Sequence, residues 1–149
     1  MIWVLKKFEE LKIEELYKIL QVRSEVFVLE QQCLYQDCDG KDEKSYHLFL
    51  EDNGEILSYL RIILRGISYD EVSIGRVLVA KDRRKKGLAR EMMLIAINFI
   101  ERKLNEQSIR ISAQMYLVDF YKSFGFKEVS DVYLEDGIEH VEMLYSKEL

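Results

Sequence analysis

The sequence predicts a mixed α/β fold, in which a mostly antiparallel sheet contains one parallel strand pair and carries helices on both faces. Three observations support this class. Short β-prone runs occupy the first half of the chain, longer stretches carry apolar residues at helical spacing, and a strand–helix–strand unit follows the meander. The crossover in that unit, from residues 72–79 to residues 109–113, should pair its two strands in parallel.

The first predicted elements are a strand at residues 3–8 and a helix at residues 13–29. The strand is short and β-prone, and the helix is expected because much of its apolar set follows helical spacing. That set is Leu16, Ile19, Leu20, Val22, Val26 and Phe27. Residues 33–45 are polar and acidic and contain Gly40, so a loop is expected there.

A meander of strands comes next. Residues 47–50 and 56–64 should form a hairpin, because Asn53-Gly54 between them is a strong two-residue turn signal. A turn region at 66–71 then leads to a strand at 72–79.

A second helix is predicted over residues 88–104, after a break in the strand pattern at 82–87. Its apolar stripe consists of Leu88, Met92, Ile95 and Phe99. The remaining elements are a strand at 109–113, a short helix at 117–124 that Gly125 should end, and strands at 126–129 and 141–145 with a turn at 135–137.

The composition indicates one domain over residues 1–149 and argues against several classes of protein. Hydrophobic residues make up 48% and charged residues 33%, as in an ordinary soluble globular protein. A net charge of −5 argues against a nucleic-acid partner, which usually needs a basic face. No apolar run is long enough for a membrane span and the start does not resemble a signal peptide, so a cytoplasmic location is expected.

Neither a disulfide nor a metal site is expected. Cys33 and Cys38 are interpreted as reduced thiols that take no part in the chemistry. His47 and His140 lie far from each other and from the cysteines, and no metal-ligand spacing recurs.

A basic loop, residues 81–87, joins the predicted strand at 72–79 to the helix that begins near Leu88. It carries four consecutive basic side chains, Arg83-Arg84-Lys85-Lys86, before Gly87. Free N–H groups and the partial positive charge at a helix start add to that field, which suits a pyrophosphate. The loop matches neither a Walker loop nor a Rossmann glycine motif. A solvated basic turn is the alternative.

Two motifs resemble those of the GNAT superfamily of acyl-CoA-dependent N-acyltransferases. Arg84-Lys85-Lys86-Gly87-Leu88-Ala89 is similar to its Gln/Arg-x-x-Gly-x-Gly/Ala signature, and Phe120-Tyr121-Lys122-Ser123-Phe124-Gly125-Phe126 is similar to its short helix that ends in Gly-Phe. A closer resemblance, to the ElaA-like group, is carried by residues 23–31, 35–42, 74–77 and 135–140. The resemblance implies the GNAT fold, with its parallel pair at the cofactor cleft.

The resemblance also implies an acetyl-CoA site. Backbone groups of Val77 and Val79 would hold the pantetheine, the backbone after Arg84 would hold the pyrophosphate, and the N–H near Leu78 would polarise the thioester. The residues assigned to this site are Val77, Leu78, Val79, Arg84, Lys85, Lys86, Gly87, Leu88, Ala89 and Gln114. Two of them depart from the family pattern, because Lys85 stands where many relatives have Gly and Gln114 where many have Asn.

Tyr121 is the family's candidate general acid, which would protonate the leaving sulfur. A free tyrosine keeps its proton at pH 7, because its pKa is about 10. The alternative is a core aromatic, since Phe120, Phe124 and Phe126 surround it in the sequence.

The residues that would bind or deprotonate the acceptor amine are less clearly indicated. Arg76 and Arg61 lie in apolar strand runs and are either solvated or a clamp for a carboxylate or phosphate. Candidates for the general base or for substrate contacts are Glu30, Asp37, Asp39 and His140. An acidic loop can instead attract a cationic amine, and deprotonation through water stays open.

The function expected from these residues is transfer of an acetyl group from acetyl-CoA to a primary amine by direct attack. The alternative is a non-catalytic module that binds or senses acyl-CoA. The sequence leaves open the identity of the acceptor and whether a homodimer forms through a sheet edge or the final strands.

Overall fold

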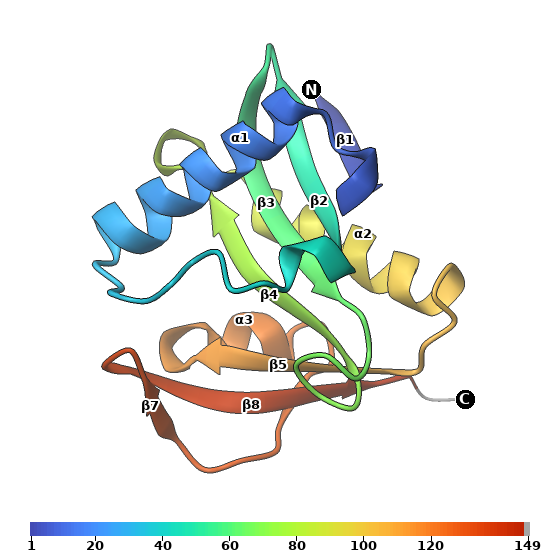
Figure 1. Cartoon of the computed structure of the whole chain (residues 1–149). Coiled ribbons are helices and arrows are strands. Elements are labelled where there is room, and N and C mark those ends of the chain that lie inside the picture. Colours follow the sequence, from blue (N-terminus) through green and yellow to red (C-terminus); the bar gives the residue numbers. More distant parts are fainter. Residues whose placement is uncertain (148–149) are drawn as a thin grey trace.

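One sheet of eight strands runs through the protein, in a computed structural model that describes residues 1–147 (Figure 1). The strand order is β1-β2-β3-β4-β5-β8-β6, and β7 pairs with β8. Only β4 and β5 are parallel among these pairs. The strands are β1 (Ile2–Lys7), β2 (Ser45–Asp52), β3 (Glu55–Ile63), β4 (Val72–Val79), β5 (Ser108–Gln114), β6 (Lys127–Glu128), β7 (Tyr133–Glu135) and β8 (Ile138–Ser146).

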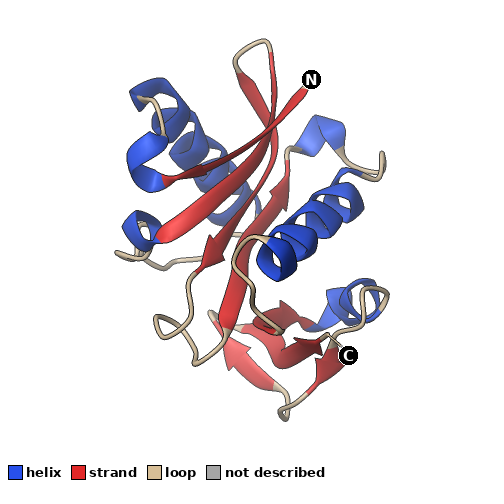
Figure 2. Cartoon of the chain, turned by 90° about the vertical axis from the view of Figure 1, so that its right-hand side faces the viewer, coloured by secondary structure: helices blue, strands red, loops and turns tan. Residues whose placement is uncertain are grey.

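Helices cover both faces of the sheet (Figure 2). On one face α1 (Ile13–Arg23) continues into a π-helix, Ser24–Glu30, and the pair packs on Phe49, Tyr59 and Leu78. On the other face α2 (Leu88–Arg102) and α3 (Val118–Lys122) enclose the larger apolar core. The predicted fold class, with its parallel pair and its helices on both faces, is confirmed.

The prediction of a hairpin with a two-residue turn at Asn53-Gly54 is confirmed. Asn53 and Gly54 have φ angles of 50° and 79°, as a two-residue turn between antiparallel strands requires. Asp136 and Gly137 form a second turn of the same kind between β7 and β8, with φ angles of 52° and 75°.

Two predicted elements differ from the structure, and one strand was not predicted. The helix expected over 13–29 is α-helical only to Arg23, and it then widens into the π-helix, a feature that apolar spacing does not reveal. The strand expected over 126–129 is reduced to β6. β7 was not predicted, because three residues are too few for an alternating pattern.

Candidate functional site

The parallel strands β4 and β5 separate soon after they meet. They pair only at Val72 with Ile109 and at Ser73 with Arg110. A bulge in β4 contributes to this divergence: Leu60 of β3 lies opposite two β4 residues, Arg76 and Val77, and Arg76 has a φ of 53°. Backbone groups of β4 beyond Ser73, including those of Val77 and Val79, therefore have no partner on β5 and border an opening in the sheet.

The basic loop leads from the end of β4 to the start of α2. Gly87 precedes the helix with a φ of 75°, in the left-handed region that favours glycine. The Glu91 N–H donates to the Gly87 carbonyl at 3.1 Å, so the N–H groups of Leu88, Ala89 and Arg90 precede the first intrahelical bond. The loop can therefore present backbone donors to an anion.

Lys85, which departs from the family's glycine, also has a left-handed backbone, with a φ of 67°. A non-glycine residue costs about 1 kcal/mol in this conformation. The backbone at Lys85 thus has the left-handed conformation that glycine favours.

Arg84 binds groups of its own chain. Its Nε donates to the Val79 carbonyl at 3.0 Å, and its Nη2 lies 2.8 Å from Glu30 at the end of the π-helix. The sequence placed Glu30 on the acceptor side and Arg84 on the cofactor side, and the structure brings the two together.

A cavity of about 510 Å³ lies on the α1 face of the sheet, where β4 and β5 diverge. Of the predicted residues, it is lined by Arg61, Arg76, Val77, Gln114, Tyr121, Asp39 and His140, and Glu135 and Asp136 line it as well. Among residues 1–147, no group of three His, Cys, Asp or Glu side chains is arranged to hold a metal ion. The residues that line the cavity thus include potential acids, potential bases and charged groups.

Tyr121 reaches this cavity from α3, although it belongs to the apolar core on the other face. Its ring makes edge contacts with Phe120 and Phe126, at centroid distances of 5.2 and 6.0 Å. Its hydroxyl has no hydrogen-bond partner among residues 1–147, and burial raises its pKa well above the ordinary value of tyrosine. The phenol is therefore a core aromatic that also presents a protonated hydroxyl to the cavity.

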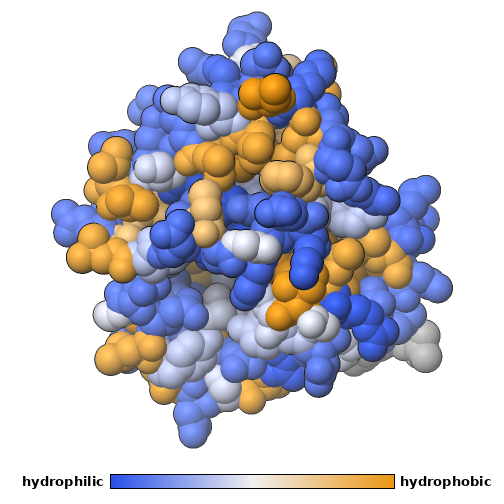
Figure 3. Space-filling model, viewed as in Figure 1, coloured by the Kyte–Doolittle hydropathy of each residue, from blue (hydrophilic) through white to orange (hydrophobic). Residues whose placement is uncertain are grey.

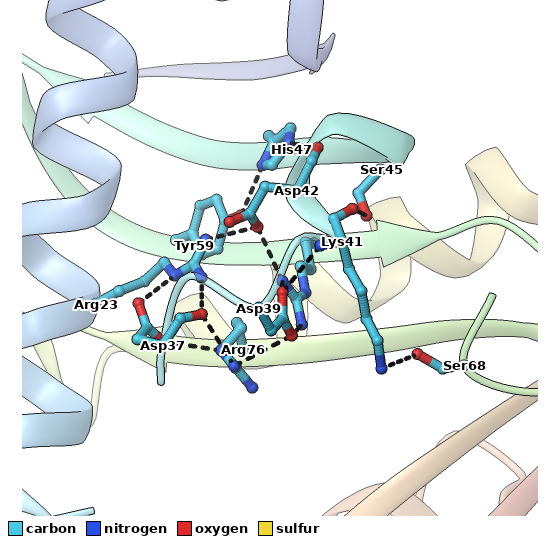
Figure 4. A network of polar contacts seen from close by, with 11 residues as sticks. Arg23, Asp37, Asp39, Lys41, Asp42, Ser45, His47, Tyr59, Ser68 and Arg76 are labelled. Atoms are coloured by element: carbon cyan, nitrogen blue, oxygen red, sulfur yellow. Dashed lines mark hydrogen bonds and ion pairs between the residues drawn. The ribbon is translucent and has the colours of Figure 1, made fainter. Parts of the chain in front are cut away.

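A network of three arginines and three aspartates holds residues 37–42 against the sheet (Figure 4). Arg23, with no exposed surface, binds Asp37 at 3.0 Å and Asp42 at 2.7 Å. Arg61 binds Asp39 and Asp42, and Arg76 binds Asp37 at 2.9 Å. The three positive and three negative charges balance one another.

This network changes the interpretation of Arg61 and Arg76. Of the two interpretations of Arg61, the solvated one is wrong, because only 2% of the residue is exposed and its fork is occupied by Asp39 and Asp42. Arg76 is likewise engaged by Asp37 and stacks on the ring of Tyr35. Aspartates of the chain thus occupy the positions where a substrate anion was expected.

The four candidate bases, Glu30, Asp37, Asp39 and His140, differ in the charged groups that they contact. Burial would raise the pKa of Asp39, but the hydrogen bond and charge of Arg61 outweigh it and hold that pKa well below its ordinary value. Asp37 is held by two arginines, and Glu30 by Arg84. His140 differs from these three, because its Nε2 lies 3.4 Å from a Glu135 carboxylate oxygen and forms an ion pair with it only when the ring is protonated.

The tautomer of His140 follows from its other nitrogen. Nδ1 lies 2.7 Å from the Ile138 carbonyl and must donate to it, so the lone pair of the neutral ring is on Nε2. Gln114 approaches Gln31, with Nε2 at 3.4 Å from Oε1, and both border the cavity. Cys33 is a buried free thiol in the same wall, and burial raises its pKa.

Sequence reasoning missed Arg23, Asp42, His47 and Tyr59. A signal existed for Arg23, since Ile19, Val26 and Phe27 lie four residues before it and three and four residues after it on the apolar side of the helix. His47 joins the network from β2: Nε2 donates to the Asp42 carbonyl at 2.9 Å, and Nδ1 accepts from the Tyr59 hydroxyl at 2.7 Å.

This geometry predicts a loss of stability in mild acid. Burial, together with the charges of Arg23 and Arg61, lowers the pKa of His47, although the Asp42 carbonyl and carboxylate oppose this. The unfolded chain therefore binds a proton below about pH 6.5 that the folded chain resists. The free energy of unfolding should fall from pH 7 to pH 5, by up to about 1.4 kcal/mol per pH unit for one proton.

Urea unfolding at several pH values tests this prediction. His47→Gln keeps a donor and an acceptor but does not titrate, so its stability should vary less over the same range. An identical pH dependence in the two proteins would contradict the role of His47. The carboxylates Asp39 and Asp42 contribute separately, below about pH 4, because their pKa values are lowered and their unfolded forms titrate there.

The diverging parallel pair, the loop before α2 and the cavity form the arrangement that residues 84–89 and 120–126 predicted for the GNAT fold. A family model described as an acetyltransferase (GNAT) domain matches residues 6–147. The chain therefore belongs to the GNAT acetyltransferase family, as the sequence motifs indicated.

Particular relatives agree with this assignment. A UPF0039 protein of Schizosaccharomyces pombe is 43% identical over 143 residues, which cover 95% of this chain and 94% of the relative. An acyl-CoA N-acyltransferase from Pseudomonas aeruginosa superposes with a TM-score of 0.93 at 38% identity, covering 97% of this chain and 99% of that one. Escherichia coli ElaA superposes with a TM-score of 0.91 at 35% identity, with the same coverage.

Proposed function

We propose that the protein transfers an acetyl group from acetyl-CoA to a primary amine. The observation that carries this proposal is the opening between β4 and β5, which has free backbone groups on one side, the α2 loop at its end and the Tyr121 hydroxyl within reach. Acyl-CoA would supply the activated thioester. The chain would supply binding, polarisation of the carbonyl and proton transfer.

The donor would be held largely by backbone. Val77 and the Val79 N–H have no β5 partner and are available to the pantetheine arm, whereas the Val79 carbonyl already accepts from Arg84 Nε. The N–H groups of Leu88 and Ala89 are available to the pyrophosphate. The N–H near Leu78 would stabilise negative charge on the thioester oxygen. Lys85 and Lys86 would add positive charge at the loop, and Arg84 would do so once released from Glu30.

Proton transfers would occur at the two sides of the opening. The amine nitrogen attacks the thioester carbon, the C–S bond breaks, and Tyr121 donates its proton to the departing sulfur. His140 is the best-placed base, because Nε2 carries the lone pair and Glu135 would stabilise the imidazolium that forms. A low pKa makes Asp39 a poor base by comparison.

A panel of primary amines incubated with acetyl-CoA tests the function, with mass detection of both the acetylated amine and free CoA. Product formation that requires the protein supports acetyl transfer. Binding of CoA without turnover of any amine would favour the sensing alternative. His140→Gln, run on the same amine, should turn over at least tenfold more slowly, and a rate within twofold of wild type would exclude His140 as the base.

Gly87→Val should weaken CoA binding by at least tenfold in calorimetry. A Cβ at Gly87 would meet no atom within 4 Å, so the cause is the backbone, because valine strongly disfavours a φ of 75°. Gly54→Val is a matched control, since Gly54 has a φ of 79° and equally open surroundings but lies in the turn between β2 and β3, outside the loop that precedes α2. Unchanged CoA affinity in folded Gly87→Val would contradict the assignment of this loop.

A further inference from the structure

One end of the cavity contains a positive charge that no carboxylate of the described residues balances. Lys41 lines it, and the Lys41 ammonium donates to the Ser68 hydroxyl at 2.9 Å (Figure 4). Among residues 1–147, no carboxylate lies within ion-pair distance of this ammonium. Lys41 therefore differs from Arg61 and Arg76, whose charges are balanced by aspartates.

Hydroxyl groups surround the same end. Tyr69 and Ser73 line the cavity there, and neither hydroxyl has a hydrogen-bond partner among residues 1–147. Burial, together with the charges of Glu142 and Glu135, raises the pKa of Tyr69 to about 12, so its hydroxyl remains a donor at neutral pH and lies on the side of this region that is nearer to the acidic end. The turn that carries Ser68 and Tyr69 is fixed by the Gly66 N–H, which donates to the Tyr69 carbonyl at 2.7 Å. One ammonium and three hydroxyls thus border a single region.

The other end of the cavity is acidic. Glu135 and Asp136 line it from the turn between β7 and β8, close to His140. The two ends are separated along β5, because Ser73 pairs with Arg110 and Gln114 pairs with His140. Gln114 lies four positions beyond Arg110 on the same strand, a rise of about 13 Å. Figure 3 shows this face of the molecule, with hydrophilic residues gathered across its middle.

We propose that the Lys41 end binds a carboxylate carried by the amine acceptor, so that the substrate is an amino acid whose amine and carboxylate lie several atoms apart. This inference rests on the proposed acetyl transfer. A monoanion fits, because one positive charge is unbalanced at this end. The amine would point to the end where Tyr121, His140 and the carboxylates of the β7–β8 turn converge. An α-amino acid is too short to span from there to Lys41.

Two CoA conjugates test the inference by calorimetry. In each, the CoA sulfur is joined through –CH₂–CO– to an amine nitrogen, from 6-aminohexanoate in one and from 6-aminohexanamide in the other. The wild-type protein should bind the carboxylate conjugate at least tenfold more tightly than the amide, because a charge-assisted hydrogen bond is worth more than a neutral one. Lys41→Met should reduce this preference to twofold or less.

Lys44→Met is the matched control. It removes the same charge from the neighbouring segment, but Lys44 is exposed and does not line the cavity, so the tenfold preference should persist. Folding is not at risk in Lys41→Met, because three hydrogen bonds that hold its backbone do not involve its side chain. The Lys41 N–H donates to Asp39, and the Ser45 hydroxyl and the Lys44 N–H donate to the Lys41 carbonyl.

The outcomes separate the two proposals. Equal affinity of the two conjugates for the wild type, a preference that survives in Lys41→Met, or conjugates that bind more weakly than CoA alone would overturn the carboxylate site while leaving CoA binding intact. Failure of CoA and of both conjugates to bind would overturn the proposed function, and the carboxylate site with it.

Discussion

Tyr121→Phe should lower kcat for acetyl transfer by about 10²–10⁴-fold, the usual contribution of a positioned general acid. Thiolate is a poor leaving group compared with a thiol, so loss of the proton donor slows breakage of the C–S bond. Burial raises the pKa of Tyr121 above its ordinary value, which keeps the hydroxyl protonated over the whole physiological range. The rate should be measured where chemistry limits turnover.

The structure separates this effect from a loss of stability. The Tyr121 hydroxyl has no partner among the described residues, and phenylalanine would keep the edge contacts with Phe120 and Phe126. Tm and CoA affinity should therefore stay close to wild type. Tyr116→Phe is a matched control, because Tyr116 borders the same cavity but is 72% exposed, and its rate should stay within about threefold. Turnover of Tyr121→Phe at the wild-type rate would remove it from the mechanism.

The cofactor side of the site could be proposed from the sequence because its residues are close together along the chain. The end of β4, the basic loop, Gly87 and the start of α2 follow one another along the chain, so their order alone predicted a basic loop with a glycine before a helix. The fold was readable for a similar reason, since helical spacing and the Asn53-Gly54 turn act over a few residues.

The contacts of the acceptor side could not be predicted from the sequence, because they join segments that are far apart along the chain. Arg76 binds an aspartate 39 positions away, and Arg61 binds partners 19 and 22 positions away. Sequence patterns identify a loop at 33–45, but they do not show which aspartate faces which arginine. The candidates Arg61, Arg76 and Asp39 line the cavity, but their pairing with one another was not predicted.

Arg23 joins the acceptor loop to the sheet. Its Nη2 donates to the Asp37 carbonyl at 2.8 Å, in addition to its two carboxylate contacts, so three points of the segment 37–42 depend on one side chain. The same segment carries Asp39 and Lys41 into the cavity wall. Stability and the shape of the acceptor site are thus linked through Arg23.

Arg23→Met should lower the free energy of unfolding by about 3–5 kcal/mol, because removal of one partner leaves a buried negative charge uncompensated. Chemical denaturation measures this loss. Arg65→Met is the control: Arg65 also pairs with a glutamate, at 3.6 Å, but its side chain is 70% exposed, and such surface pairs contribute little.

The double variant Arg23→Met/Asp42→Asn tests whether charge balance is the cause. It restores two positive and two negative charges, in which Arg61 retains Asp39 and Arg76 retains Asp37. The double variant should therefore be more stable than the sum of the two single losses by at least about 1 kcal/mol, the coupling expected for residues in one ion-pair network. Strictly additive losses would show that Arg23 stabilises the loop by packing alone, since packing of its buried stem does not depend on the charge of Asp42.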